Sequence, residues 1–288
     1  MNSLQSFLLR TCLFLLSALM TNTARAFSEN NDTIDNLTDM KETMLLLTLP
    51  TGEVRIKLYN ETPLHRDNIL KLVREGFYDG TLFHRVIKDF MVQGGDPASR
   101  TAAAGDSLGA GDVGYTIPAE FHSDLYHKRG ALAAARMGDE MNPERASSGC
   151  QFYIVTGKKY NQSQLTQLEK QITQSRAQEF FQQLVKERAE DIKKYRMERN
   201  RNALFALQEE LAAQAEALAA EKNPFRYTKE QIEVYTKEGG TPFLDGQYTV
   251  FGEVVSGMEH IDAMSKVKTD RNDRPAENIP MRISVIEE

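Results

Sequence analysis

The sequence predicts a mainly-β fold, an antiparallel barrel or sandwich, that is interrupted by a helical insertion. Residues 77–156 alternate short β-prone runs with glycine-rich loops, and the same pattern returns at residues 247–255. Between them, residues 161–222 contain neither Gly nor Pro and are rich in Gln, Glu, Ala and Leu, which is typical of helices. Because this block interrupts a β pattern, its two ends are expected to lie close together on the parent fold.

The N-terminus predicts export. Arg10 precedes a short apolar run, and residues 1–26 resemble a secretory signal peptide that is cleaved between Ala26 and Phe27. An uncleaved anchor is the alternative, although the apolar run is short for a membrane span. Residues 27–43 are expected to be a flexible, polar leader. We therefore expect a periplasmic protein, with secretion as the alternative; the arginine near Cys12 disfavours a lipid anchor.

Charge and cysteine content exclude several function classes. The net charge is −6, and removal of Arg10 and Arg25 with the signal peptide takes it to −8, so a basic surface for nucleic acid is not expected. Cys150 would be the only cysteine of the mature chain, which leaves no internal disulfide. The five histidines show no metal-ligand spacing, so no metal site is expected.

Local signals predict the first and last elements. Two strand-like runs flank Pro50-Thr51-Gly52, which indicates a hairpin. A helix is expected to follow, with Thr62 as its N-cap, Pro63 as its first residue and Gly76 just after its last turn. A short helix beginning at Met258 and a strand over residues 281–287 complete the chain.

The inserted helices are expected to form a hairpin. Residues 176–201 carry eight basic and five acidic groups, whereas residues 202–222 carry one basic and four acidic groups. Opposite charges favour two helices that fold back on each other, with a turn somewhere in residues 188–202. A capping box at Thr228 and Gln231 predicts a last helix. The apolar stripe is interpreted as helix packing, with a partner-binding face as the alternative.

The stretch Phe83–Asp96, FHRVIKDFMVQGGD, places an arginine inside an apolar run. A buried unpaired charge is costly, so Arg85 is expected to be paired, at the rim of the core, or facing a ligand. In a regular strand, Phe83, Arg85 and Ile87 would share one face, with the intervening residues on the other.

This stretch closely resembles the signature block of the cyclophilins. Three further blocks match in the same order: ALAAARMG (131–138), GCQFYIVTG (149–157) and TPFLDGQYTVFGEV (241–254). The resemblance covers residues 44–158 and 239–288, leaving an insertion at 159–238. It implies a closed eight-stranded antiparallel barrel with two capping helices and an active groove on its outer face. The combination of predicted export and a helical insertion in this chain resembles bacterial periplasmic members of the family.

Resemblance to cyclophilins implies peptidyl-prolyl cis/trans isomerase activity without a nucleophile or cofactor. Rotation of an X–Pro amide is opposed by a barrier of about 20 kcal/mol, because twisting breaks resonance. By this resemblance Arg85 donates a hydrogen bond to the proline nitrogen in the twisted state, which favours the transition state over both planar states. Gln93 is the second catalytic residue; it binds the substrate backbone and orients the arginine.

The resemblance also implies a groove for the substrate around the proline. Tyr153 replaces the usual Phe, Arg136 the usual Asn, Phe243 the frequent Trp and Tyr248 the frequent His. Without the indole N–H we expect weak cyclosporin sensitivity. Either Phe152 or Tyr153 is expected to contribute to the proline pocket. The implied substrate-binding residues are Phe90, Met91, Ala135, Arg136, Gln151, Phe152, Tyr153, Phe243, Leu244 and Tyr248.

The expected function is isomerisation of X–Pro bonds in unfolded or loop segments of exported proteins during folding. The alternative is a non-catalytic peptide-binding chaperone or scaffold that uses the helical insertion to hold clients. The insertion could also dock a dedicated partner or mediate self-association. The presence of the whole set Arg85, Phe90, Met91 and Gln93 favours the enzyme, because an idle scaffold has no reason to keep it.

Overall fold

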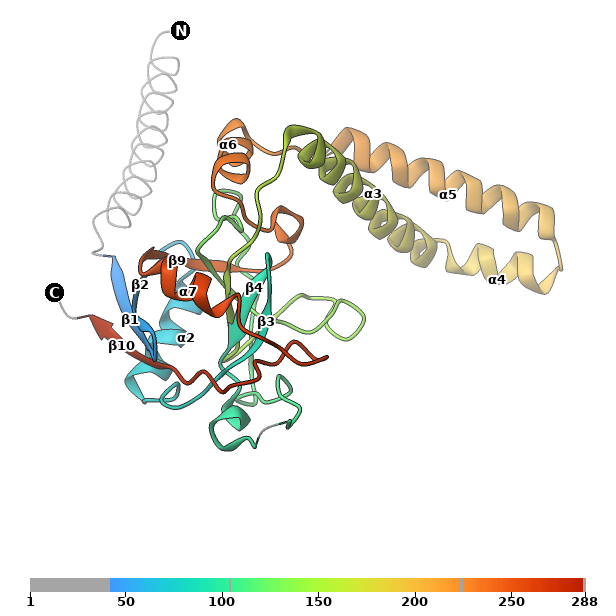
Figure 1. The fold of residues 1–288 in the computed structure, drawn as a ribbon. Coiled ribbons are helices and arrows are strands. Elements are labelled where there is room, and N and C mark those ends of the chain that lie inside the picture. Colours follow the sequence, from blue (N-terminus) through green and yellow to red (C-terminus); the bar gives the residue numbers. More distant parts are fainter. Residues whose placement is uncertain (1–41, 104, 223–224, 287–288) are drawn as a thin grey trace, which may run out of the picture. The chain divides into compact units, whose positions relative to one another are not determined.

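The computed structural model describes residues 42–103, 105–222 and 225–286 (Figure 1). Residues from Met44 onward form one compact unit, and the fold below is that of this unit. The predicted signal peptide and all but the end of the predicted leader lie outside the described residues. Within the described ranges, no helix has the length and apolar character needed to cross a membrane.

The main element is a curled antiparallel sheet of eight strands in the order β10-β1-β2-β9-β6-β8-β4-β3. The predicted hairpin around Pro50-Thr51-Gly52 is confirmed by β1 and β2. Residues 116–117 (β5) and 147–148 (β7) form a separate two-stranded sheet. The eight strands are β1 (Thr43–Leu49), β2 (Gly52–Leu58), β3 (Phe83–Ile87), β4 (Met91–Gly94), β6 (Ala131–Ala134), β8 (Phe152–Val155), β9 (Val250–Ser256) and β10 (Arg282–Ile286).

The prediction of a closed barrel is wrong, because the edge strands β10 and β3 do not pair with each other. The chain segments at the two edges are hydrogen-bonded to each other around the start of β3 and just before β10. There the N–H of Phe83 donates to the carbonyl of Ile279 at 3.0 Å, and the N–H of Met281 donates to that of Thr81 at 2.9 Å. Pro280 lies between these partners and has no N–H to extend a ladder.

Helices α2 (Pro63–Arg74) and α7 (Met258–Met264) pack on the sheet. Thr62 occupies the predicted N-cap position of α2, but its side chain makes no capping bond. The carboxylate of Glu120 replaces it, accepting the N–H groups of Leu64 and His65 at 3.0 Å each. The α2 C-terminus follows the prediction: Gly76 has φ of 67°, and the N–H of Phe77 donates to the Leu72 carbonyl.

The hydrophobic core lies between the concave face of the curled sheet and these two helices. In β1, Leu45, Leu47 and Leu49 are buried at alternate positions, as expected for a strand with one face on the core. Ile69 of α2 and Ile261 of α7 belong to the same cluster. This packing fixes the opposite, outer face of β4, β6 and β8 as the surface available for a binding groove.

The insertion consists of α3 (Gln162–Glu187), α4 (Ala189–Met197), α5 (Arg201–Lys222) and α6 (Lys229–Lys237). Helix α3 packs against α5, and the chain turns back between α4 and α5, inside the range predicted from charge (Figure 1). The capping box of α6 at Thr228 and Gln231 is confirmed. From Leu207 to Ala219 every fourth residue of α5 is buried, which makes a narrow packing seam: Leu207, Leu211, Ala215 and Ala219.

Candidate active site

A bulge in β3 determines where Arg85 points. The register between β3 and β4 shifts between Phe83 and Arg85, so the alternation of faces is broken there. Phe83 therefore packs in the inner core, with its ring 6.1 Å from that of Phe152, and the prediction that it shares a face with Arg85 is wrong. Ile87 lies on the outer face of the sheet, as predicted, and packs against the apolar cluster that contains Met91 and Tyr153. The side chain of Arg85 is 44% exposed and lies at the rim of the outer groove.

A pocket of about 150 Å³ opens beside this arginine and is called the Arg85 pocket below. Its apolar floor is made by Met91 and Tyr153, both nearly fully buried. Nine of the twelve predicted site residues therefore come together in one place, although they are spread over more than 160 positions of the chain. The lining residues are Arg85, Phe90, Met91, Gln93, Ala135, Arg136, Tyr153, Leu244 and Tyr248.

The other three predicted residues, Phe152, Gln151 and Phe243, do not line this pocket. Phe152 points into the inner core, because neighbouring residues of β8 face opposite sides; Tyr153 is thus the member of the pair that reaches the pocket. Gln151 and Phe243 lie next to it. The Phe243 ring lies 5.7 Å from the Phe90 ring and remains 37% exposed.

A chain of amide hydrogen bonds orients the arginine. An Arg85 Nη1–H donates to Gln93 Oε1 at 3.4 Å, and Gln93 Nε2 donates to Gln151 Oε1 at 3.0 Å. Gln151 Nε2 in turn donates to the carbonyls of Gly109 and Gly111. An ion pair with Asp273 at 3.7 Å adds a second, weak restraint. Since a guanidinium has five N–H donors, several remain to serve a ligand in the pocket.

Asp96 supports this chain and was not predicted as a site residue. It is fully buried, and its carboxylate accepts the N–H groups of Gly109 and Gly111, whose carbonyls hold Gln151. The signal was present in the Gly-Gly-Asp end of the signature block. Gly95 has φ of 94°, and a Cβ there would collide with the carbonyl of Cys150, so glycine is required next to the aspartate.

A second unpredicted network satisfies the Tyr153 hydroxyl. The hydroxyl oxygen lies 2.9 Å from Nε2 of His127, and Nδ1 of the same ring lies 2.9 Å from Asp245. The other oxygen of Asp245 accepts the hydroxyl of Tyr235 in α6 at 2.6 Å. With Nδ1–H donating to the carboxylate, Nε2 is left to accept the Tyr153 hydroxyl. Burial raises the pKa of Tyr153 well above its usual value, so the phenol keeps its proton.

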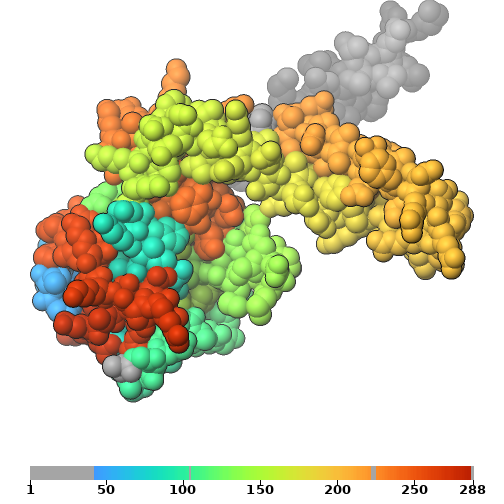
Figure 2. Space-filling view, turned by 45° about the vertical axis from the view of Figure 1, so that its right-hand side comes forward, coloured from blue at the N-terminus to red at the C-terminus, as the bar shows by residue number. Residues whose placement is uncertain are grey.

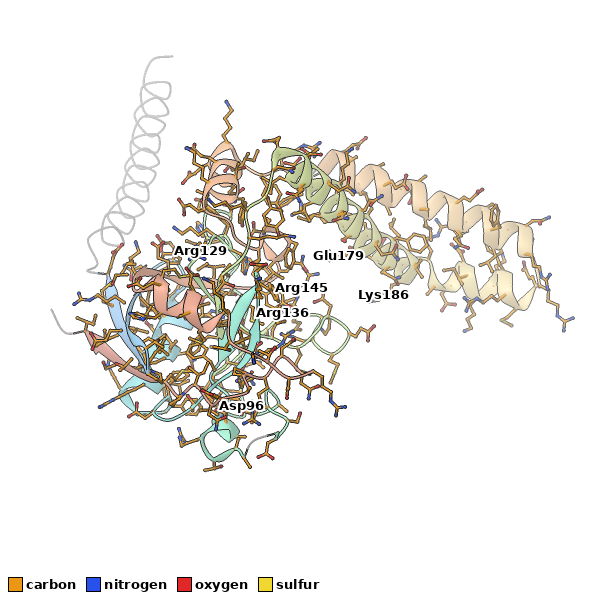
Figure 3. The ribbon with its side chains drawn as sticks, viewed as in Figure 1. Asp96, Arg129, Arg136, Arg145, Glu179 and Lys186 are labelled. Carbon is orange, nitrogen blue, oxygen red and sulfur yellow. The ribbon has the colours of Figure 1, made fainter. Side chains whose placement is uncertain are left out.

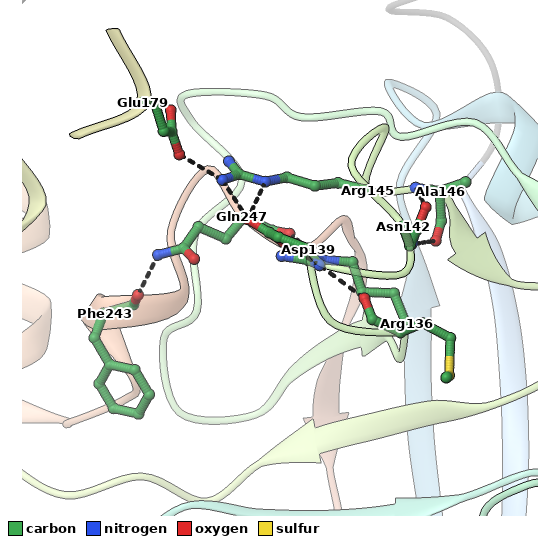
Figure 4. A network of polar contacts seen from close by, with 9 residues as sticks. Arg136, Asp139, Asn142, Arg145, Ala146, Glu179, Phe243 and Gln247 are labelled. Carbon is green, nitrogen blue, oxygen red and sulfur yellow. Dashed lines mark hydrogen bonds and ion pairs between the residues drawn. The ribbon is translucent and has the colours of Figure 1, made fainter. Parts of the chain in front are cut away.

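Arg136 is a wall of the pocket whose charge is already paired. Its guanidinium lies 4.4 Å from the centre of the Tyr248 ring, and its Nε–H donates to the Gln247 carbonyl at 2.8 Å. Asp139 accepts from both Arg136 and Arg145, and Arg145 also contacts Glu179 of α3 at 2.6 Å (Figures 3 and 4). Burial opposes ionisation of Asp139, but hydrogen bonds from the two arginines lower its pKa.

Burial limits the chemistry open to Cys150. Cys150 is buried, and burial raises the pKa of its thiol to about 11, which disfavours the reactive thiolate. Among the residues that the structure describes, no three His, Cys, Asp or Glu side chains are grouped so that they could hold a metal ion. The Arg85 guanidinium lines the pocket and remains 44% exposed.

Comparisons with known proteins find matches over most of the chain. Residues 44–285 match the family model described as "Cyclophilin type peptidyl-prolyl cis-trans isomerase/CLD". A provisionally named peptidyl-prolyl cis-trans isomerase of Staphylococcus aureus (strain USA300) is 27% identical over 238 residues, covering 82% of this chain and 88% of the relative. A relative in Staphylococcus epidermidis with the same name matches to the same extent.

A solved structure supports the fold. The crystal structure of a Cryptosporidium parvum cyclophilin type peptidyl-prolyl cis-trans isomerase superposes with a TM-score of 0.50 at 18% identity. The match covers 86% of this chain and 99% of the other. At this identity the similarity concerns the arrangement of the sheet and its helices.

Proposed function

The chain belongs to the cyclophilin-type peptidyl-prolyl cis-trans isomerases, and from that membership we propose how its groove performs the reaction and where the protein works. The observation that carries the proposal is the position of Arg85. A permanently charged donor stands at the rim of a small pocket with an apolar floor, and Gln93 accepts a hydrogen bond from it. The pocket has the size needed for a proline ring, and its floor has the apolar character.

Arg85 acts in the twisted state of the X–Pro bond. When the amide twists, resonance is lost and the proline nitrogen regains a lone pair that accepts a hydrogen bond. A guanidinium N–H aimed at that nitrogen is used in the transition state and not in either planar state, so it lowers the barrier in both directions. Arginine suits this role because it keeps its charge at every physiological pH and presents rigid donors.

The other pocket residues bind and orient the substrate. Phe90, Met91, Tyr153 and Leu244 surround the proline ring, and Gln93 hydrogen-bonds the substrate backbone while it steadies the arginine. Ala135 and Arg136 flank the peptide backbone, and the hydroxyl of Tyr248 serves a substrate carbonyl. No covalent intermediate and no cofactor takes part.

The proposed substrates are proline-containing unfolded or loop segments of exported proteins, most directly in a periplasm. The support is in the sequence: an apolar N-terminal run after Arg10 that ends in a small-x-small pattern at Ala24 and Ala26. Without a disulfide, the mature domain depends on its core for stability in such a compartment.

The test of the activity is cis-to-trans relaxation of a short X–Pro peptide in the presence of the mature protein. We expect the folded wild-type protein to accelerate relaxation in proportion to its concentration. A folded protein that binds the peptide without accelerating relaxation would reject the isomerase and favour the non-catalytic peptide-binding chaperone.

A further inference from the structure

A second groove lies next to the Arg85 pocket, between α3 of the helical insertion and loops that adjoin the eight-stranded sheet. It has a volume of about 400 Å³, which is within the range of ligand-binding sites. One wall is formed by one face of α3, because the α3 residues that line the groove recur at intervals of three or four positions. This α3 face consists of Leu168, Gln171, Ile172, Ser175, Arg176 and Glu179.

The opposite wall comes from two loops that lie outside the insertion. Asp139 and Arg145 lie on one loop, and Phe243 and Gln247 lie on the other. In Figure 2 the start of α3 (yellow-green) and the loop near residue 140 (light green) flank the orange-red segment that follows residue 240. The ion pair between Arg145 and Glu179 joins the two walls (Figure 4).

The groove is continuous with the Arg85 pocket. Phe243 lines the groove, and its ring packs on Phe90, which lines the pocket. Gln247 lines the groove, and its carbonyl accepts from Arg136 in the pocket wall. A peptide chain bound with its proline in the pocket can therefore continue across Phe243 into the groove without leaving the surface.

The lining matches an extended peptide. Leu168, Ile172 and Phe243 provide apolar contact for a substrate side chain, and all three are partly accessible. Gln171 and Ser175 are exposed on the same face and carry groups that can donate to or accept from a peptide backbone. The charged groups of the walls occur with both signs, so the groove selects for shape and apolar content more than for net charge.

We propose that this groove is a substrate subsite, in which α3 binds residues that flank the proline of an extended client segment. The proposal rests on the isomerase function of the Arg85 pocket and adds to it. A peptide of a few residues occupies the pocket alone, whereas a longer unfolded segment also occupies the groove. The insertion thereby gives the enzyme a preference for unfolded chains over short turns.

The test compares short and extended substrates in two variants of α3. The substrates are an X–Pro tetrapeptide, a version extended by about six residues at its N-terminus, and a version extended by about six residues at its C-terminus. Each added segment spans roughly 20 Å when fully extended. Ser175→Trp fills the groove from an exposed helical position. Gln174→Trp places the same ring on another exposed position outside the groove and is the matched control.

In the wild type we expect kcat/KM for one of the extended peptides to exceed that of the tetrapeptide by about tenfold, corresponding to one buried apolar side chain. Ser175→Trp should abolish this gain while leaving tetrapeptide turnover within twofold, which also shows that the variant is folded. Gln174→Trp should keep the gain.

Equal turnover of all three peptides by the wild type would overturn the subsite, and so would a gain that survives Ser175→Trp. A change of oligomeric state in Ser175→Trp, with the gain intact, would assign the groove to a second copy of the chain. Absence of tetrapeptide turnover in the wild type would instead reject the isomerase function itself, so the two failures are distinguishable.

Discussion

The Arg85 pocket and the helical insertion are built in opposite ways. The pocket collects side chains from β3, β4, β8 and the segments that follow β6 and α6, and hydrogen bonds to distant loops hold them in place. The insertion relies on contacts between neighbouring helices, and its ion pairs, such as Arg188–Asp191, are solvent-exposed and contribute little. A change in the pocket should therefore alter chemistry, whereas a change in the helical seam should alter local stability.

The largest effect is expected from Arg85→Ala. Loss of one preorganised donor to developing charge costs about 10²–10³ in rate, so kcat/KM for an X–Pro tetrapeptide should fall by that factor. Lys88→Ala removes a neighbouring exposed cation outside the pocket and is the control. Equal losses in the two variants would reduce the role of Arg85 to general electrostatics.

Leu211→Ala tests the helical seam. Leu211 is buried between the helices, and its truncation should destabilise their packing by roughly 2–3 kcal/mol. Hydrogen exchange should increase in α3 and α5 while tetrapeptide turnover stays within twofold of the wild type. A parallel loss of turnover would show that the pocket depends on the insertion for its geometry.

Tyr153→Phe separates the hydrogen bond of the Tyr153 hydroxyl from the role of the ring in the pocket. The substitution restores the residue usual in the family but leaves Nε2 of His127 buried without a partner, so it should lower the free energy of unfolding by about 1–3 kcal/mol. Turnover should change by less than threefold, since the ring remains. Chemical denaturation and peptide relaxation measure the two effects. A stability unchanged from the wild type would mean that the hydroxyl contributes nothing.

These networks also mark the limit of what the sequence could predict. The first hairpin, the helix after Thr62 and the helical insertion followed from local signals, and nine pocket residues followed from the four family blocks. The β3 bulge, the unclosed edge at Pro280 and the replacement of the Thr62 cap by Glu120 depend on contacts between distant segments. His127 and Asp245 were missed for the same reason, because 118 positions separate the two residues.

Phe243→Trp should increase cyclosporin affinity. It restores the indole N–H donor expected in sensitive family members, and a hydrogen bond contributes about 0.5–1.5 kcal/mol, so inhibition should improve by up to about tenfold. As the chain has no tryptophan, the new residue also reports ligand binding by its fluorescence. Phe243→Tyr, which lacks the indole, is the control. Unchanged inhibition would contradict the role given to this position.

The smallest effect concerns pH. Burial lowers the pKa of His84 and of His65, so the folded protein takes up protons less readily than the unfolded chain. Their contribution to stability is complete above the unfolded pKa of about 6.5 and declines as the pH falls below it. Tm should decrease modestly between pH 7.5 and 5.5, and His122→Gln, at an exposed position, should leave that slope unchanged. A constant Tm over this range would contradict the account.

The central claim is that Arg85 stabilises the twisted amide and neither planar state. NMR exchange spectroscopy of a bound X–Pro peptide measures both directions of rotation on the enzyme, together with the peptide Kd. In Arg85→Ala, both on-enzyme rates should fall by the same factor while Kd stays within twofold of the wild type. If Kd weakened by the factor lost in kcat/KM and the on-enzyme rates were unchanged, Arg85 would be a binding residue and the mechanism proposed here would be wrong.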